Sequence, residues 1–204
     1  CIRDRNTYLK TMKWKECKSL ISSDLSRLAS INKWGGVKNL LFNASFRITF
    51  WFRIGSYLIT KHHFIAKFCL IFVQLIHKHN QYLTGIQIGF GTKIGKALMF
   101  PHYSCIVING AAIIGDNCTI YHGVTIGSVR GPKGGVPRIG NNVVIASGAK
   151  VIGNVTVGNN VMIGSGSIVI TDIPDNSVVV GIPGKVISKE GLEHTKYYSK
   201  NYDS

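Results

Sequence analysis

The sequence predicts a mainly β protein, a left-handed parallel β-helix preceded by an α-helical N-terminal region. Two observations lead to this prediction. From Ile88 onward, short segments that open on Ile or Val recur every six residues, and 23 glycines supply tight turns in a chain of 204 residues. Before Ile88 that period is absent, and clusters of aromatic and aliphatic residues favour helices.

The N-terminal region, residues 1–84, is expected to consist of helices. The polar cluster at 22–24 is a candidate N-cap, and the Trp-Gly-Gly segment at 34–36 is expected to interrupt the helical pattern. An aromatic-rich stretch follows at 40–58, and another helix is predicted over about 64–82.

The net charge of +15 is concentrated in this region. Residues 1–84 carry 14 Lys and Arg against 3 Asp and Glu, a balance of +11. A basic surface suits nucleic acid, an anionic membrane or an anionic glycan, but no recognised nucleic-acid motif accompanies it. Three interpretations stay open for these helices: contact with a membrane surface, packing in an oligomer, and a solvated face without a specific partner.

The apolar run at 64–76 contains Lys67 and is shorter than the roughly 20 residues that span a bilayer. No signal peptide is evident. Five cysteines without a CxxC pair argue against a disulfide framework and against a zinc cluster, and indicate buried or half-buried free thiols. We therefore expect a cytoplasmic protein, either free or peripheral at the inner face of the membrane.

The six-residue repeats form the predicted β-helix over residues 85–188, and a tail follows at 189–204. Twelve repeats can be placed between residues 88 and 174; eleven open on Ile or Val, and Phe100 opens the other. Each repeat corresponds to one short strand and a turn, three repeats make one coil, and the opening aliphatic residue points inward. Coincidental spacing in a β-sandwich does not explain so long a run.

Two departures from the period are candidate functional positions, because a solenoid accommodates insertions by looping them out. The first is a two-residue excess around His102. The second is the glycine-rich, basic excursion at 127–138.

The repeats, the Phe-Pro-His segment at 100–102, the Gly-Pro-Lys-Gly-Gly segment at 131–135 and the closing Gly-Ile-Pro-Gly-Lys at 181–185 together resemble the serine acetyltransferase family. The resemblance covers about residues 80–188. Within that family the sequence looks closest to the branch that acetylates sugars in bacterial capsule and surface-polysaccharide pathways. The resemblance implies a homotrimer or a dimer of trimers, with acetyl-CoA in the cleft between neighbouring β-helices and no metal.

On this resemblance His102 falls on the family's catalytic histidine. An imidazole suits the reaction, because it can take the proton of an attacking hydroxyl and return it to the departing thiolate. Gln87 stands where the family has a carboxylate that orients the imidazole, and it is a second catalytic candidate. His122, Tyr103 and Pro101 are candidates for binding the acceptor.

The cofactor candidates also follow from the resemblance. The pantetheine arm of CoA is expected along Gly127, Ala146 and Ser165, and Lys185 near the phosphates. Arg130 and Lys133 in the excursion, with Arg138 beside it, are secondary candidates for phosphate contacts.

Four positions differ from the serine enzymes. Pro101 replaces a carboxylate that contacts serine, Gln87 replaces the orienting carboxylate, and the uncharged pair at 135–136 replaces an Arg-His pair. We therefore expect a sugar or polysaccharide hydroxyl as the acceptor. Two alternatives stay open: a serine O-acetyltransferase of cysteine biosynthesis, and a non-catalytic β-helix that binds glycans.

Overall fold

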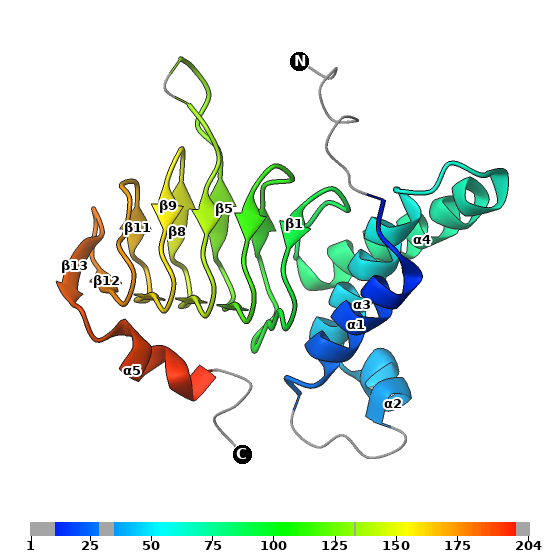
Figure 1. The fold of residues 1–204 in the computed structure, drawn as a ribbon, viewed down its shortest axis with the longest axis horizontal. Coiled ribbons are helices and arrows are strands. Elements are labelled where there is room, and N and C mark those ends of the chain that lie inside the picture. The colour runs from blue at the N-terminus through cyan, green and yellow to red at the C-terminus, as the bar shows by residue number, and fades with distance from the viewer. Residues whose placement is uncertain (1–10, 29–34, 133, 199–204) are drawn as a thin grey trace.

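The computed structural model describes residues 11–28, 35–132 and 134–198. Helices come first in the chain, and a coil of short strands with three flat faces follows (Figure 1). The predicted fold class is confirmed: a left-handed parallel β-helix follows an N-terminal helical region.

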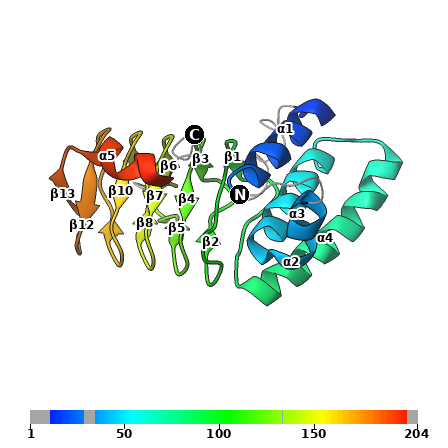
Figure 2. The ribbon, with the colours of Figure 1, turned by 90° about the horizontal axis from the view of Figure 1, so that it is seen from below.

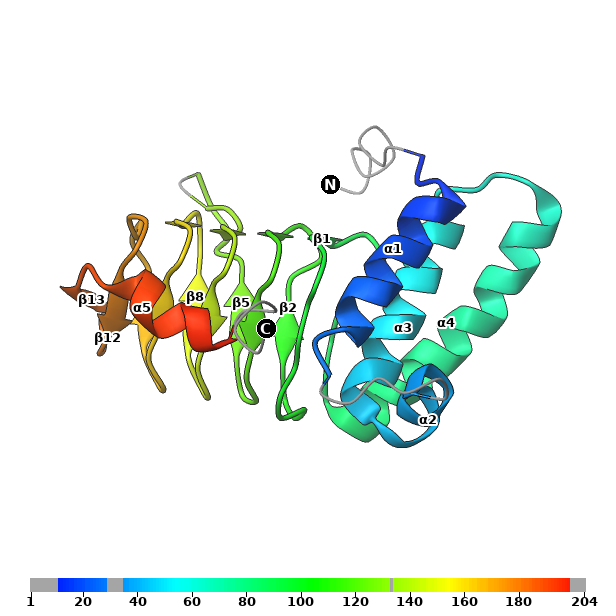
Figure 3. The ribbon, with the colours of Figure 1, turned by 60° about the horizontal axis from the view of Figure 1, so that its bottom comes forward.

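The helices preceding the coil are α1 (Trp14–Leu25), α2 (Gly35–Phe42), α3 (Ala44–Leu58) and α4 (Phe64–Thr84). α3 lies between α1 and α4, and the C-terminal end of α4 leads into the first coil (Figures 2 and 3). Asn43 separates α2 from α3, because its side chain accepts a hydrogen bond from the Phe46 amide at 3.0 Å and caps α3. Gly85 ends α4 in the left-handed conformation, with φ 69°. In the described part of the chain, no helix has the length and hydropathy needed to cross a bilayer.

One local prediction for the helices is wrong: residues 22–24 do not cap a following helix but lie in the last turn of α1, where the Asp24 carboxylate pairs with Arg53. The helical pattern does break before residue 36, since α1 ends at Leu25, but Gly35 and Gly36 already belong to α2, and Trp34 lies outside the described residues. The thiol prediction holds only in part, since Cys17 and Cys118 are buried whereas Cys69 and Cys105 are exposed.

The strands are β1 (Lys93–Ile94), β2 (Val107–Ile108), β3 (Ile113–Ile114), β4 (Thr119–Ile120), β5 (Thr125–Gly127), β6 (Arg138–Ile139), β7 (Val144–Ile145), β8 (Lys150–Ile152), β9 (Thr156–Val157), β10 (Met162–Ile163), β11 (Ile168–Val169), β12 (Val178–Val180) and β13 (Lys185–Ser188). The first face contains β1, β3, β6 and β9; the second contains β4, β7, β10 and β12; the third contains β2, β5, β8 and β11. Pairing within each face is parallel, and β13 pairs antiparallel with β12 at the end of the second face. α5 (Gly191–Thr195) and the short 3-10 helix η1 (Lys196–Tyr198) then run back along the coil (Figure 1).

The interior of the coil is a stack of aliphatic side chains. On the second face, Ile120, Ile145 and Ile163 lie in register and are fully buried. The other faces repeat this arrangement, so each coil covers the apolar interior of the next.

One corner of the coil is held by a ladder of asparagines in the left-handed conformation. The Asn117 amide donates to Asn142, Asn142 to Asn160, and Asn160 to Asn176, each at 2.9 Å. Their φ values lie between 54° and 59°, a region that Asn tolerates better than most residues. Neutral side chains thus stabilise the turns from one coil to the next.

A buried ion pair joins the helices to the first coil. Arg53 and Asp24 are each 2% exposed, and the Arg53 Nε lies 2.8 Å from the Asp24 Oδ2. The guanidinium also donates to the carbonyls of Ile94 and Gly95 at 2.7 and 2.6 Å, and Asp24 accepts from the Leu98 amide at 2.9 Å. The pair therefore connects α1, α3 and the first coil.

Candidate active site

His102 lies in the turn that leads from the second face to the third in the first coil, and strand register locates the extra residues there. Lys93 pairs with Ile113, and Met99 with Thr119, a separation of 20 residues in both cases. After the turn, Val107 pairs with Thr125, a separation of 18. The two additional residues therefore fall between Met99 and Val107, where the sequence had indicated them.

The turns at this corner stack upon one another down the coil. The Gly123 amide donates to the Ser104 carbonyl, Gly148 to His122, and Gly166 to Ser147, each at 2.9 Å. We call the side chains of these turns the corner row: His102, Tyr121, His122, Ala146, Ser147 and Ser165. The corner row brings one predicted base, one predicted acceptor residue and two predicted cofactor residues onto a single edge of the coil.

Within the corner row, His102 is exposed and lies among aromatic rings. Its ring centroid is 5.8 Å from that of Tyr121 and 6.0 Å from that of His122. His122 Nδ1 lies 3.4 Å from the Ser147 hydroxyl oxygen. The arrangement can present an imidazole and a hydroxyl to a polar molecule at the edge of the coil.

The C-terminal segment also reaches the corner row. Tyr198 packs edge-on against Tyr121, with ring centroids 6.4 Å apart, and the Arg27 guanidinium donates to the Tyr198 carbonyl at 2.6 Å. Burial, and after it the neighbouring Tyr198, raise the pKa of Tyr121. Neither tyrosine was predicted as a site residue. Tyr121 precedes His122 directly, which is a usable signal, but nothing in the sequence links Tyr198 to the corner.

Gln87 precedes the first coil and extends the third face by one position, where it forms a parallel β-bridge with Val107. Its backbone N–H donates to the Ile106 carbonyl at 2.7 Å, and its backbone carbonyl accepts from the Ile108 N–H at 2.9 Å. Its side chain is exposed, and no hydrogen bond of the described residues joins it to His102. Its role in orienting the imidazole therefore stays a prediction, as do the acceptor roles of Pro101 and of Tyr103, which is 48% exposed beside His102.

Gly127 lies at the other end of the third face from the corner row. It ends β5 and pairs with Ile152, and a Cβ at this glycine would come 2.9 Å from the Ile152 Cδ1. Gly127 therefore does not touch Ala146 or Ser165, but all three border the same face. An extended ligand along this face would contact all three.

The basic excursion is a hairpin that stands away from the coil (Figure 1). Val129 and Gly135 exchange hydrogen bonds of 3.1 and 3.0 Å. Arg130 is exposed on this hairpin, and Lys133 lies outside the described residues. Lys185 is exposed at the start of β13, at the end of the coil far from the helices. Arg130 and Lys185, two of the predicted cations, therefore lie on separate parts of the coil.

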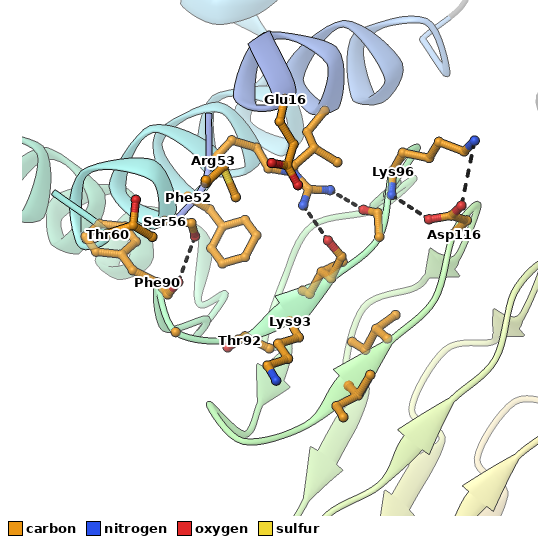
Figure 4. Close-up of a pocket in the computed structure, with 17 residues that line it drawn as sticks. Glu16, Phe52, Arg53, Ser56, Thr60, Phe90, Thr92, Lys93, Lys96 and Asp116 are labelled. Carbon is orange, nitrogen blue, oxygen red and sulfur yellow. Dashed lines mark hydrogen bonds and ion pairs between the residues drawn. The ribbon is translucent and has the colours of Figure 1, made fainter. Parts of the chain in front are cut away.

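A separate pocket lies where α1 and α3 meet the first coil (Figure 4). Its lining includes Phe52, Phe90 and Arg53, and the Ser56 hydroxyl donates to the Phe90 carbonyl at 2.8 Å. Because Arg53 is already paired with Asp24, this pocket belongs to the packing of the junction.

The sequence is similar to a known family of repeats and to enzymes of one kind. Residues 137–171 match the family model described as "Bacterial transferase hexapeptide (six repeats)". The chain is 42% identical over 139 residues to the serine acetyltransferase of Staphylococcus xylosus, an alignment covering 68% of this chain and 64% of the relative. It is 39% identical over 128 residues to the serine acetyltransferase of Staphylococcus aureus strain N315, covering 62% and 60%. The chain thus spans less than two thirds of the length of these curated relatives.

Solved structures agree with the sequence comparison. The serine acetyltransferase of Neisseria gonorrhoeae superposes with a TM-score of 0.70 and 28% identity, over 85% of this chain and 66% of that one. The same enzyme in complex with serine gives a TM-score of 0.71 and 25% identity, over 85% and 70%. This chain is similar to serine acetyltransferases.

These similarities correct the acceptor predicted from the sequence. The preference for a sugar or capsular polysaccharide is wrong, because the relatives found by sequence and by fold are serine acetyltransferases. That preference depended on a few positions, Pro101, Gln87 and the pair at 135–136, whereas the similarity extends over 139 residues. Individual uncharged positions do not define an acceptor, because a charge for the same ligand group can come from another part of a site.

Proposed function

We propose that this chain transfers the acetyl group of acetyl-CoA to the hydroxyl of serine. The observation that carries the proposal is its 42% identity to a serine acetyltransferase over 139 residues. The superposition on a relative solved in complex with serine supports it. The proposal makes the acceptor an amino acid and the thiol of CoA the leaving group.

His102 acts as the general base in this proposal. Its imidazole takes the proton from the serine hydroxyl as the oxygen attacks the thioester carbonyl and the C–O bond forms. The tetrahedral intermediate then collapses, the C–S bond breaks, and the imidazolium returns the proton to the CoA thiolate. The exposure of His102 and its place at the register break support this role.

The corner row surrounds His102 at the edge of the coil. Tyr121 and His122 flank the His102 ring at 5.8 and 6.0 Å, and Ser147 adds a hydroxyl beside His122. The pantetheine arm lies along the third face from Ala146 and Ser165 to Gly127, where backbone amides and carbonyls at the edge can pair with its amide groups. Arg130, Lys133 and Lys185 are the proposed cations for the phosphates. Assembly into trimers stays a prediction from the sequence, to be measured by analytical ultracentrifugation.

A thiol-release assay tests the proposed acceptor. Acetyl-CoA is incubated with the full chain and, in separate reactions, with L-serine, simple sugars and oligosaccharides. We expect L-serine to release CoA faster than every sugar. Comparable release with all acceptors, or none above the slow hydrolysis of acetyl-CoA, would contradict the proposal.

L-serinamide is an informative further acceptor in the same assay. Pro101, Gln87 and Tyr103 carry no charge, so none of them forms an ion pair with the carboxylate of serine. If no cation from another part of the site pairs with that carboxylate, serinamide should keep a substantial part of the rate. A loss of on the order of 10²-fold or more would instead indicate that a cation elsewhere in the site pairs with that carboxylate.

A further inference from the structure

The outward side of α4 is a continuous apolar surface. We call the following side chains the outer face of α4: Phe64, Ile65, Phe68, Ile71, Phe72, Leu75, Tyr82 and Leu83, which are between 53% and 82% exposed. Spacings of three, four and seven residues place them along one side of the helix. Phe68 and Phe72 contact each other edge-on, with ring centroids 5.0 Å apart.

The opposite side of α4 already has its packing partners. Ala66, Val73, His77, Asn80 and Thr84 are buried, and α4 packs mainly on α3. α4 forms the outer edge of the helical region in two views (Figures 2 and 3). The outer face is therefore not needed for the packing of α4 on this chain, and the described residues leave it open to solvent.

The charges around this surface have one sign. Residues 35–84, which contain α2, α3 and α4, include six Lys and Arg but no Asp or Glu. Lys67 and Lys78 are exposed and lie three helical turns apart on one border of the outer face. Lys78 Nζ lies 5.1 Å from the centre of the Tyr82 ring. An apolar stripe with aromatic rings and bordering lysines matches helices that lie in a membrane interface.

Charge complementarity selects between the two surfaces that could cover the outer face. A second copy of the chain that packed face to face would bring its own lysines to the contact, and α2, α3 and α4 offer no carboxylate to pair with them. Anionic lipid headgroups supply that pairing while the acyl region receives the apolar side chains. The lipid surface therefore satisfies both the apolar and the charged groups.

We propose that the outer face of α4 docks on a bilayer containing anionic lipid, with the helix in the plane of the interface. The rings and aliphatic side chains enter the boundary between headgroups and acyl chains, and Lys67 and Lys78 meet the phosphates. This surface lies at the opposite end of the molecule from β12 and β13 (Figure 1). The proposal is independent of the acceptor proposed for the corner row.

Sedimentation of the full chain with vesicles tests the proposal. The vesicles contain either phosphatidylcholine alone or phosphatidylcholine with phosphatidylglycerol. We expect the chain to sediment with the second kind and much less with the first, and added salt to weaken this binding because it screens the lysines. Phe68→Ser with Leu75→Ser should abolish binding, and Lys67→Gln with Lys78→Gln should weaken it by on the order of tenfold or more.

Two matched variants control for general effects of polarity and charge. Ile182→Ser with Ile187→Ser removes apolar side chains that are 73% and 63% exposed on the β-helix. Lys93→Gln with Lys189→Gln removes two exposed lysines away from α4. Both should bind as the unchanged chain does, and circular dichroism should show that all variants are folded.

Three results would overturn the proposal. The unchanged chain could remain in the supernatant with both kinds of vesicle. The Phe68 and Leu75 variant could bind as well as its control. Alternatively, ultracentrifugation could show that the unchanged chain forms a larger assembly that this variant does not form. If the unchanged chain also fails to bind vesicles, the outer face would be assigned to contact between copies.

Discussion

The β-helix and the helical region differ in the burial of their apolar side chains. In the coil, Ile120, Ile145 and Ile163 are fully buried because each coil covers the next. In α4, Phe64 is 82% and Leu75 64% exposed, on the side that the described residues do not cover. Each coil of a repeating fold packs on the next coil of the same chain. A single helix at the edge of a bundle instead needs another molecule or surface to cover a second apolar side.

The two regions also differ in how they use polar groups. The coil stabilises its corner with neutral side chains, such as the pair Asn142 and Asn160. The junction with the helices instead contains the buried pair of Arg53 and Asp24. A neutral ladder tolerates local change because each amide is small and partly exposed, but a buried charge depends on its one partner.

The largest expected effect tests the junction. Asp24→Asn keeps one acceptor oxygen, replaces the other with an NH2 donor and removes the charge, and Arg53 cannot lose its proton. We expect the free energy of unfolding, measured with urea, to fall by about 3–5 kcal/mol. Asp116→Asn is the matched control, because its pair with Lys96 is exposed and 3.8 Å long, and it should cost less than about 1 kcal/mol. Equal losses in both variants would contradict the importance assigned to the buried pair.

The next prediction compares a buried apolar side chain of the coil with an exposed one of α4. Ile145→Ala opens a cavity inside the coil and should cost about 2–5 kcal/mol. Phe64→Ser on the outer face of α4 should change the free energy of unfolding by no more than about 0.5 kcal/mol in the absence of lipid. A large loss for Phe64→Ser would show that the outer face is already buried in a stable assembly.

A third prediction concerns the region in which the chemistry takes place. His102→Ala should lower the rate of acetyl transfer by on the order of 10²-fold or more, while CoA binding survives. His79→Ala, an exposed histidine on α4, should leave the rate unchanged. Steady-state thiol release measures the first effect, and calorimetric titration with CoA measures binding. If His102→Ala keeps its rate, His122 becomes the next candidate for the base.

The smallest predicted effect depends on pH. Burial lowers the pKa of His77, whose Nε2 lies 2.9 Å from the Ile88 carbonyl. Its buried Nδ1 has no hydrogen-bond partner among the described residues, so a proton there would be unpaired. The unfolded chain takes up a proton at about pH 6.5 and the folded chain resists it. Stability is therefore full above about pH 6.5 and is lost as the pH falls toward the folded pKa.

Urea unfolding at about pH 7 and about pH 5 measures this dependence. We expect the unchanged chain to lose more stability on acidification than His77→Phe does. His79→Phe, which replaces an exposed histidine, should show the same acid loss as the unchanged chain. An identical loss in the unchanged chain and in His77→Phe would assign the acid sensitivity to other groups.

Much of the β-helix could be predicted, because its signal is local and repeated. Both register breaks were placed correctly, since an interruption of a regular period is visible in the sequence alone. The same local reading failed in the helices: it assigned Asp24 to a cap, whereas the structure pairs it with a residue 29 positions away. It also chose the wrong acceptor, because isolated substitutions near His102 outweighed the similarity of the whole segment.

By itself, then, the sequence determined the coil, its period and the position of His102 in the turn with two additional residues. Each of these is encoded within a few consecutive residues and then repeated. Only the tertiary structure decided that Tyr198 lies against Tyr121, that Arg53 is buried on Asp24, and that the apolar side of α4 faces outward. Those features depend on contacts between residues far apart in the chain, and the spacing of residues in the sequence carries no record of them.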